Sequence, residues 1–322
     1  MRRIGVILAL LLVLPAWPAL ASTESAGALR PYRVHVPAGL TEPSALVVYL
    51  HGCNQTAEDA EVGTRWSEVA DEHGFVVAYP EQVPEANGAR CWNWFLPEHQ
   101  QRGAGEPAIL HDIVQRVIAA HPIDASRVYV AGASAGADMA TILAATYPDV
   151  FAAVAPFAGC AYATCADVTG ALAREAMGDL AGPVPAFVVQ GTADPLNNAA
   201  MGETAVQQWV GTNGVSPVPT SSEDHGDATP GTPASGDTCV RNAQFPCLAG
   251  ATGWEAYPYT VHHHADTDGC SLVDAVYVHG LSHDYPGGNP EGSFTDPAGP
   301  DVSRLTWSFF ARHRVGAPCA SA

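Results

Sequence analysis

The stretch VYVAGASAGADM, residues 128–139, decides the fold of this chain. A β-branched and aromatic run, typical of a buried strand, stops at a glycine, and small residues suited to a helix follow at once. Between them, the pattern Gly132-x-Ser134-x-Gly136 places a serine between two glycines. Because glycine has no Cβ, neighbouring backbone can pass close on either side of the serine. We therefore predict a sharp strand-to-helix turn that exposes the Ser134 hydroxyl as a nucleophile.

Strand and helix patterns alternate along the chain on both sides of this turn. Continuous apolar runs at 45–50 and 75–79 are typical of strands that are buried on both faces. Further strands are predicted at 30–36, 127–131, 151–156, 185–190 and 273–279, and helices at 56–72, 106–120, 137–147, 203–210 and 302–314. This alternation predicts an α/β fold with a mostly parallel, doubly wound sheet. Together with the serine turn, it is the pattern of an α/β-hydrolase.

The 322 residues predict one catalytic domain behind an export signal. Arg2 and Arg3 precede an apolar run at 4–14, and small residues at 19–21 suit signal peptidase, so we expect a signal peptide over 1–21 and a single domain over 22–322. Residues 211–253 are rich in Gly, Pro, Ser and Thr without periodicity, which predicts a loop insertion before the last strand. No later segment is apolar enough to span a bilayer. We expect a secreted protein, extracellular or periplasmic.

The amino-acid composition limits the classes of molecule that the protein is expected to bind. The formal net charge of −19 argues against nucleic acid and anionic membranes, and favours a neutral ester over a polyanionic substrate. Solubility of an exported protein would also explain this acidity. Eight cysteines predict disulfides in an oxidising compartment. The pairs favoured by closeness in sequence are Cys160–Cys165 and Cys239–Cys247, and the preferred long bridge is Cys53–Cys91. No CxxC pair exists, so we predict neither a metal nor another cofactor.

A nucleophilic serine needs a base and a group that orients the base. In this fold class the acid follows the serine along the chain, and the histidine follows the acid. Asp194 follows a predicted strand and a glycine turn, which predicts that it is the acid, although a turn aspartate can also bind its own backbone. His283, in a Gly- and Pro-rich loop after the last strand, is the predicted base. His279 is the alternative base and Asp167 the alternative acid.

Two N–H groups should stabilise the oxyanion, and we assign them to Ala135 and to Cys53 in the loop after strand 45–50. His51, beside that loop, is expected to orient the substrate rather than to act as a base. Trp92 and Trp94 are candidates for an apolar substrate wall, although loop aromatics fill a core equally often. The histidines at 262–264 are not a favoured metal site, because adjacent residues of an extended chain point to opposite faces.

Four stretches together resemble the polyhydroxybutyrate (PHB) depolymerase-type esterases, a group that includes relatives acting on feruloyl and acetyl esters of plant polysaccharides. They are LHGCNQT at 50–56, RCWNWF at 90–95, GEP at 105–107 and GASAGA at 132–137. The resemblance is close over residues 30–155 and absent over the predicted insertion. It implies a secreted serine esterase with Ser134, Asp194 and His283 as its triad, and with the Cys53 loop in its oxyanion hole.

The chain also departs from this family. Asp284, Tyr285 and Pro286 follow the predicted base where relatives often carry an aromatic residue, which would alter the cleft. Many extracellular depolymerases append a linker and a surface-binding domain. Because this chain stops after the last predicted helix, we expect inefficient attack on crystalline polymer.

The sequence therefore predicts a serine esterase that hydrolyses poly(3-hydroxybutyrate)-type polyester, or its oligomers, through an acyl-enzyme. The alternative within enzymes is a feruloyl or acetylxylan carbohydrate esterase. A more distant alternative is a non-catalytic envelope protein that uses a hydrolase scaffold for binding, since a fold alone does not fix a function. The expected partner is the ester substrate, and the sequence does not indicate an oligomeric state.

Overall fold

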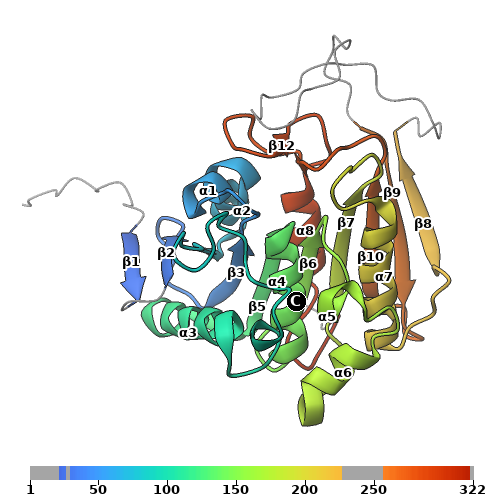
Figure 1. Ribbon diagram of the computed structural model, residues 1–322, viewed down its shortest axis with the longest axis horizontal. Coiled ribbons are helices and arrows are strands. Elements are labelled where there is room, and N and C mark those ends of the chain that lie inside the picture. Colours follow the sequence, from blue (N-terminus) through green and yellow to red (C-terminus); the bar gives the residue numbers. More distant parts are fainter. Residues whose placement is uncertain (1–21, 27–29, 227–256, 320–322) are drawn as a thin grey trace, which may run out of the picture.

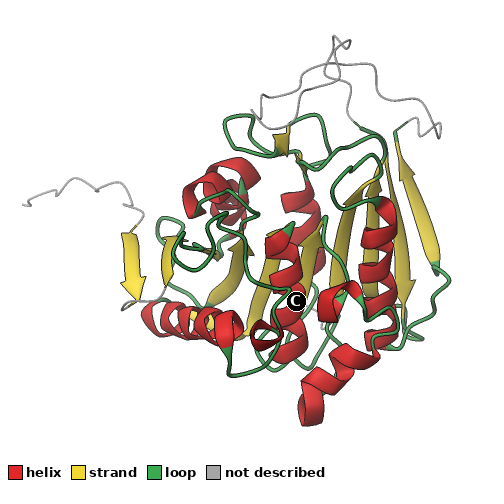
Figure 2. Cartoon of the chain, viewed as in Figure 1, coloured by secondary structure: helices red, strands yellow, loops and turns green. Residues whose placement is uncertain are grey.

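The computed structural model describes residues 22–26, 30–226 and 257–319, in which strands and helices alternate (Figure 2). The strands are β1 Ser22–Ala26, β2 Arg30–His35, β3 Ser44–Leu50, β4 Val76–Pro80, β5 Ile123–Ala133, β6 Ala153–Phe157, β7 Ala186–Gly191, β8 Ser221–His225, β9 Tyr259–Ala265, β10 Ser271–Val278, β11 Tyr285–Pro286 and β12 Thr295–Asp296. The helices are α1 Ala57–Thr64, α2 Trp66–His73, α3 Gly105–Ala120, α4 Ala135–Thr146, α5 Tyr162–Cys165, α6 Ala171–Met177, α7 Ala199–Asn213 and α8 Val302–Phe310, with 3-10 turns η1 Pro97–His99 and η2 Gly178–Leu180. The predicted signal peptide lies outside the described residues.

A ten-stranded sheet runs through the described part of the chain in the order β1-β2-β4-β3-β5-β6-β7-β10-β9-β8 (Figure 1). Its inner strands, from β4 to β10 in this order, pair in parallel. The strand pairs at both edges are antiparallel. The predicted α/β fold with a mostly parallel sheet is confirmed. Parallel strands bring their carboxyl ends to one edge of the sheet, where ligand sites of such folds form.

Hydrophobic cores cover both faces of the sheet. Helices α3, α4, α6 and α7 pack on one face, and α1, α2 and α8 pack on the other (Figure 1). Strand β3 shows why the inner strands are apolar throughout, because Leu46, Val48 and Leu50 enter the first core while Val47 and Tyr49 enter the second. Successive strand residues alternate between faces, so a strand covered on both sides needs no polar positions.

Several segments differ from the sequence prediction, which lacks strand β9 and helix α6 among others. The helix predicted over 56–72 is broken at Arg65, whose φ of 61° separates α1 from α2. Thr56 caps α1 as predicted, in a reciprocal capping box with Asp59. Of the predicted insertion, 211–213 belong to α7, and 221–225 form β8, which pairs with β9. The polar strand β8 is exposed, so no hydrophobic alternation marks it, and only its long-range partner makes it a strand. Residues 227–253 lie outside the described part.

Three disulfides occur in the described part of the chain. The predicted pairs Cys53–Cys91 and Cys160–Cys165 are confirmed. A third bridge, Cys270–Cys319, ties the C-terminal segment to the start of β10. The predicted pair of Cys239 and Cys247 lies outside the described residues. None of the helices in the described ranges is long and apolar enough to cross a membrane.

We expect a Cys270→Ser, Cys319→Ser double variant to lose about 4 kcal/mol of unfolding free energy, because the bridge closes a long loop and lowers the entropy of the unfolded chain. The two cysteines are 49 residues apart. Cys160 and Cys165 are only 5 apart, so the matched double serine variant should lose about 2 kcal/mol. Urea unfolding of the three proteins measures both losses. A smaller loss for the long bridge than for the short one would contradict this expectation.

Candidate active site

Ser134 lies at the turn between β5 and α4, with φ 54° and ψ −123°. A non-glycine residue in such a conformation costs on the order of 1–3 kcal/mol and persists only where its surroundings enforce it. The Ser134 N–H donates to the Phe157 carbonyl at 2.9 Å. A Cβ on Gly132 would overlap the Gly136 carbonyl, and one on Gly136 would overlap the Leu50 carbonyl. The turn is therefore the one that the sequence predicts, and both glycines are needed for close backbone approach.

Asp194 and His283 come from the loops that follow two neighbouring parallel strands, β7 and β10. His283 Nδ1 lies 2.7 Å from Asp194 Oδ2. The other carboxylate oxygen of Asp194 accepts the N–H groups of Leu196 at 2.8 Å and Asn197 at 2.9 Å. The Asp194 side chain is fully buried, and that of His283 is 12% exposed. Hydrogen bonds thus hold both oxygens of the Asp194 carboxylate. Because Nδ1 of His283 is engaged with Asp194, Nε2 is the ring nitrogen that is available to another partner.

The two loops are tied to each other directly. The Ala193 N–H donates to the Leu281 carbonyl at 3.0 Å, and the Thr192 N–H donates to the Val278 carbonyl at 2.9 Å. A Cβ on Gly191 would lie 2.5 Å from the Leu281 carbonyl oxygen, so only glycine lets the loops approach this closely. The glycine before Asp194 therefore sets the distance between the carboxylate and the histidine loop.

Ser134 and His283 line the same cavity, which has a volume of about 370 Å³. No hydrogen bond joins the two side chains in the described ranges, and such bonds often tighten only when substrate binds. The walls are mainly apolar, and their large side chains come from strand ends and from the loops that follow them. These side chains are Tyr49, Phe157, Val189, Leu196, Leu281, Tyr285 and Phe294. An apolar cavity of this size suits a small uncharged substrate.

The backbone N–H groups of Cys53 and Ala135 have no acceptor among the described residues. Ala135 is the first residue of α4, so its N–H has no partner within the helix. Cys53 lines the cavity from the loop after β3. Two donors without acceptors, one next to Ser134 in the chain and one in the cavity lining, suit an oxygen that gains negative charge.

Several bonds hold the Cys53 loop in place. Cys53 itself is bridged to Cys91. The Asn54 N–H donates to the Ala89 carbonyl at 2.7 Å, and Trp92 Nε1 donates to the His51 carbonyl at 3.1 Å. The segment around residues 89–92 is thus the support of this loop.

His51 is fully buried and does not line the cavity. Its Nδ1 donates to the Gly52 carbonyl at 2.7 Å, and its Nε2 accepts the Gln82 N–H at 3.0 Å. Burial lowers the pKa of His51, and a neutral ring is the form that can accept this bond. The prediction that His51 contacts substrate is therefore wrong, because the ring braces the base of the Cys53 loop.

The predicted substrate wall of Trp92 and Trp94 is also corrected. Trp92 is fully buried and Trp94 packs against the core, and neither lines the cavity. Both rings thus pack with the core and not into the cavity. Tyr49 and Phe157 line the cavity instead. Their position near the carboxyl ends of parallel strands was the available signal.

Glu106 is a residue whose part in the site the sequence did not reveal. It lies fully buried in the first turn of α3 and accepts the Asn93 N–H at 2.7 Å, Asn93 Nδ2 at 2.8 Å and Gln82 Nε2 at 2.6 Å. Arg30 contacts the same carboxylate at 3.2 Å. Because Gln82 binds His51 and Asn93 adjoins Trp92, this carboxylate supports both contacts that brace the Cys53 loop.

The alternative acid and base lie elsewhere. His279 Nε2 is 2.9 Å from the Thr260 hydroxyl, and His279 does not line the cavity. Asp167 accepts the Ala173 N–H at 2.7 Å, in the first turns of α6, and is likewise absent from the cavity lining. The structure brings His283 and Asp194 together and leaves these two residues in structural roles.

The histidines at 262–264 face three different segments. His262 is hydrogen-bonded to the Ser222 hydroxyl, His263 to the Asp274 carboxylate and His264 to the Ser216 carbonyl. Their ring nitrogens do not converge, as the alternation of side chains along a strand requires.

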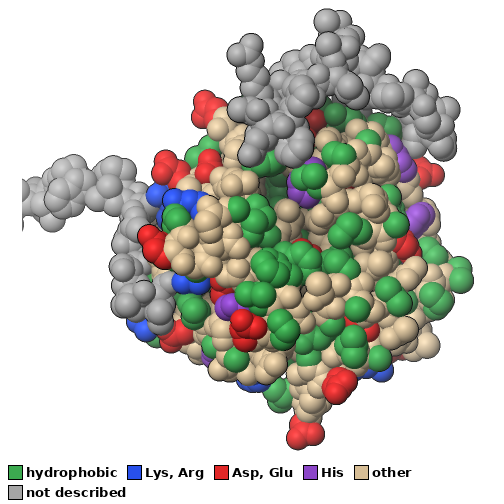
Figure 3. All heavy atoms as spheres, viewed as in Figure 1, with side chains coloured by type: hydrophobic (Ala, Val, Ile, Leu, Met, Phe, Trp, Pro, Cys, Tyr) green, Lys and Arg blue, Asp and Glu red, His purple; other side chains and the backbone are tan. Residues whose placement is uncertain are grey.

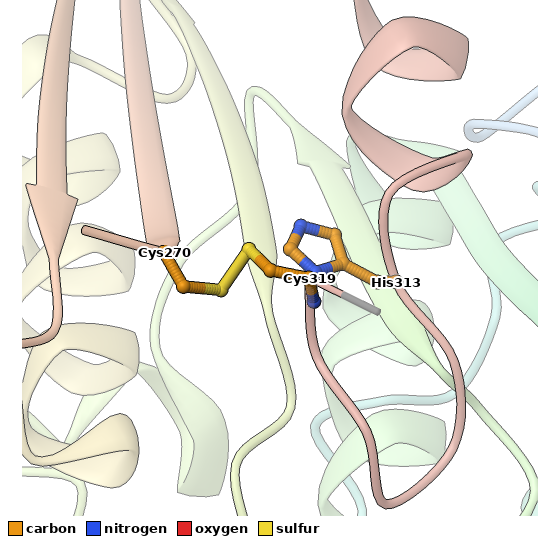
Figure 4. A group of neighbouring side chains, drawn as sticks. All are labelled: Cys270, His313 and Cys319. Carbon is orange, nitrogen blue, oxygen red and sulfur yellow. Dashed lines mark hydrogen bonds between the residues drawn. A yellow bond between two sulfur atoms is a disulfide. The ribbon is translucent and has the colours of Figure 1, made fainter. Parts of the chain in front are cut away.

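One cluster of potential metal ligands occurs in the described ranges, at Cys270, His313 and Cys319 (Figure 4). The two sulfur atoms are joined in a disulfide, so neither is a thiolate. His313 Nδ1 accepts the Cys319 N–H at 3.2 Å, and burial lowers the pKa of His313 to about 3. A neutral buried ring thus packs against the bridge that anchors the C-terminal segment.

The family model described as Esterase PHB depolymerase matches residues 31–216. The chain belongs to this family. Poly(3-hydroxyalkanoate) depolymerase C of Paucimonas lemoignei is 36% identical over 260 residues, which are 78% of this chain and 58% of that protein. Feruloyl esterase B of Neurospora crassa is 40% identical over 138 residues, 42% of this chain and 46% of that protein. The chain thus spans about half the length of these curated relatives.

A solved structure supports the fold. The acetyl xylan esterase from Aspergillus awamori aligns with a TM-score of 0.61 and 22% identity, over 82% of this chain and 92% of that one. The shared architecture is the α/β sheet with helices on both faces, and the family match confirms the resemblance recognised in the sequence.

We expect Glu106→Gln to lower the unfolding free energy by about 3 kcal/mol, because an amide places an N–H₂ group where buried donors need an acceptor. The matched control is Glu98→Gln, an exposed glutamate in η1 without a side-chain partner in the described ranges, which should change stability by less than about 0.5 kcal/mol. Urea unfolding measures both. Equal stability of the two variants would show that the Glu106 network does not support the fold.

Proposed function

We propose that this protein hydrolyses carboxylic esters through a covalent acyl-enzyme, with Ser134 as nucleophile, His283 as base and Asp194 as the group that orients the base. The observation that carries this proposal is the 2.7 Å contact between Asp194 and His283 at the cavity that the strained Ser134 also lines. A buried carboxylate on one ring nitrogen fixes the tautomer in which the other nitrogen can accept a proton. The family match supports ester hydrolysis.

In the proposed reaction, Ser134 Oγ attacks the ester carbonyl while His283 Nε2 takes the hydroxyl proton. Asp194 accepts a hydrogen bond from Nδ1 and stabilises the imidazolium. The N–H groups of Cys53 and Ala135 stabilise the negative oxygen of the tetrahedral intermediate. The imidazolium then gives its proton to the leaving alcohol. Water, activated by the same histidine, attacks the acyl-enzyme and releases the acid, so the cycle needs no cofactor.

We further propose that the substrate is a short-chain hydroxyalkanoate polyester or its oligomers. The apolar cavity of about 370 Å³ has room for a short acyl group. The Paucimonas relative, whose name gives poly(3-hydroxyalkanoate) as its substrate, matches over 78% of this chain. Figure 3 shows hydrophobic side chains across the middle of one face, with acidic side chains scattered around them. An apolar surface with little positive charge suits a neutral polyester better than a polyanion.

Export is part of the proposal. The sequence pattern at residues 1–21 and the three disulfides support a secreted protein, because such bonds persist in oxidising compartments.

A carbohydrate esterase is the second candidate. Feruloyl esterase B of Neurospora crassa and acetylxylan esterase A of Emericella nidulans are 40% and 36% identical over 138 and 129 residues. These alignments cover less of the chain than that of the depolymerase, 42% and 40% against 78%. This difference in coverage favours the polyester.

We expect Ser134→Ala to abolish hydrolysis of 4-nitrophenyl butyrate, with kcat reduced about 10⁶-fold, and Asp194→Asn to reduce kcat about 10⁴-fold through the wrong tautomer of His283. The matched controls are Ser308→Ala and Asp179→Asn, at exposed positions outside the cavity, which should keep the wild-type rate. Steady-state kinetics measures all five proteins. A folded wild type without esterase activity would favour the non-catalytic binding protein.

We expect the hydroxybutyrate trimer methyl ester to be hydrolysed with at least roughly tenfold higher kcat/KM than methyl ferulate, because a flat phenolic acyl group needs a flatter and longer pocket than a short aliphatic hydroxyacyl group does. Chromatography of the released acids measures both rates. A faster reaction with methyl ferulate or with acetylated xylan would assign the protein to the carbohydrate esterases instead.

A further inference from the structure

The charged side chains that line the cavity at Ser134 are acidic. Its lining residues in the described ranges include neither lysine nor arginine, but they include two carboxylates outside the proposed triad, Asp59 and Asp284. Asp59 serves the fold, because its Oδ2 accepts the Thr56 N–H at 2.9 Å and the Thr56 hydroxyl at 2.8 Å in the capping box of α1. Asp284 has no comparable structural role.

Asp284 follows His283 directly and is half-buried at the cavity. Its carboxylate forms no hydrogen bond or ion pair with any residue in the described ranges. Asp194 differs, because His283 and two backbone N–H groups compensate its charge. Of the two carboxylates beside the histidine, only Asp284 therefore presents an uncompensated negative charge to a bound molecule.

The charged and titratable groups that face Asp284 are His283, Asp194, Asp296 and Tyr257. Burial, together with the negative charges of Asp296 and Asp194 and against the opposing effect of His283, raises the pKa of Asp284 to about 6. Asp284 is thus ionised at neutral and alkaline pH, and neutral in mild acid.

We propose that Asp284 is a specificity-determining residue that makes the cavity reject esters carrying an anionic group. The proposal rests on the proposed function, since it concerns the esterase cavity around Ser134. An anionic group brought into this cavity meets Asp284 in a partly desolvated space without a cation to compensate it. In a polyester, the ester bond next to a free carboxylate end would be cut more slowly than an interior bond. The acid that hydrolysis releases would be repelled as soon as it ionises.

A matched pair of chromogenic esters tests the proposal. They are 3-carboxy-4-nitrophenyl butyrate, which is anionic, and its neutral methyl ester, 3-methoxycarbonyl-4-nitrophenyl butyrate, with the same acyl group and nearly the same leaving group. The measured quantity is the ratio of kcat/KM for the neutral ester to that for the anionic ester, between about pH 5 and about pH 8. A pH effect on the reaction steps that both esters share changes both rates equally and cancels in this ratio. The nitrobenzoate group stays ionised over the whole range.

For the wild type we expect a ratio of roughly tenfold at about pH 8 that falls towards 1 at about pH 5, as Asp284 becomes neutral. In Asp284→Asn the ratio should be small and independent of pH. The control Asp179→Asn removes the same charge from an exposed site outside the cavity and should keep the wild-type ratio. Asp284→Ser, with a smaller side chain, is a second variant in case the asparagine variant does not fold.

The outcomes separate this inference from the proposed function. A wild type that hydrolyses both esters, with a ratio that does not change with pH or that persists in a folded Asp284 variant, would overturn the role of Asp284 alone. A folded wild type that hydrolyses neither ester would overturn the esterase proposal and this inference with it. A ratio lost in Asp284→Asn and kept in Asp179→Asn would support the inference.

Discussion

The close packing of the β5–α4 turn against the end of β3 is the constraint on which the rest of the site depends. Gly136 meets the Leu50 carbonyl, and Gly132 meets Gly136, at separations that exclude any side chain. This approach forces Ser134 into its positive-φ conformation and sets it beside the Cys53 loop that follows β3. One contact between two backbone segments thus aligns the proposed nucleophile and the proposed oxyanion donors.

The Cys53 loop needs support from other residues, because the free N–H group of Cys53 forms no hydrogen bond in the described ranges that would hold it in place. A buried polar network provides that support. Glu106 gathers donors from Asn93 and Gln82, Gln82 fixes His51, and the Cys53–Cys91 bridge closes the arrangement. Both oxygens of the buried Glu106 carboxylate accept hydrogen bonds, which makes this part of the network rigid, whereas Gln82 Oε1 has no partner in the described ranges. Substrate contact and support are therefore divided between different residues.

The two carboxylates beside His283 differ in how their charge is compensated. The proposed triad places one compensated carboxylate, Asp194, behind His283, whereas Asp284 lies beside the same ring without a partner in the described ranges. Asp194 would stabilise the His283 imidazolium that forms during the proposed reaction. Asp284 would repel an anion that enters or leaves the cavity. The acidic composition of the chain gives no hint of this difference, which arises because one carboxylate is hydrogen-bonded and the other is not.

The sequence by itself determined the fold class, the serine turn, the capping of α1 by Thr56 and two of the disulfides, because each of these depends on neighbouring residues or on spacing. The choice of Asp194 and His283 followed from chain order, and the structure places them 2.7 Å apart. The sequence could not reveal that Trp92 and Trp94 pack with the core, that His51 supports the Cys53 loop, or that Ser221–His225 pairs with β9. Only the tertiary structure decided these features and the unpaired state of Asp284, because they depend on which distant groups come to lie beside each residue, and local patterns carry no record of such neighbours.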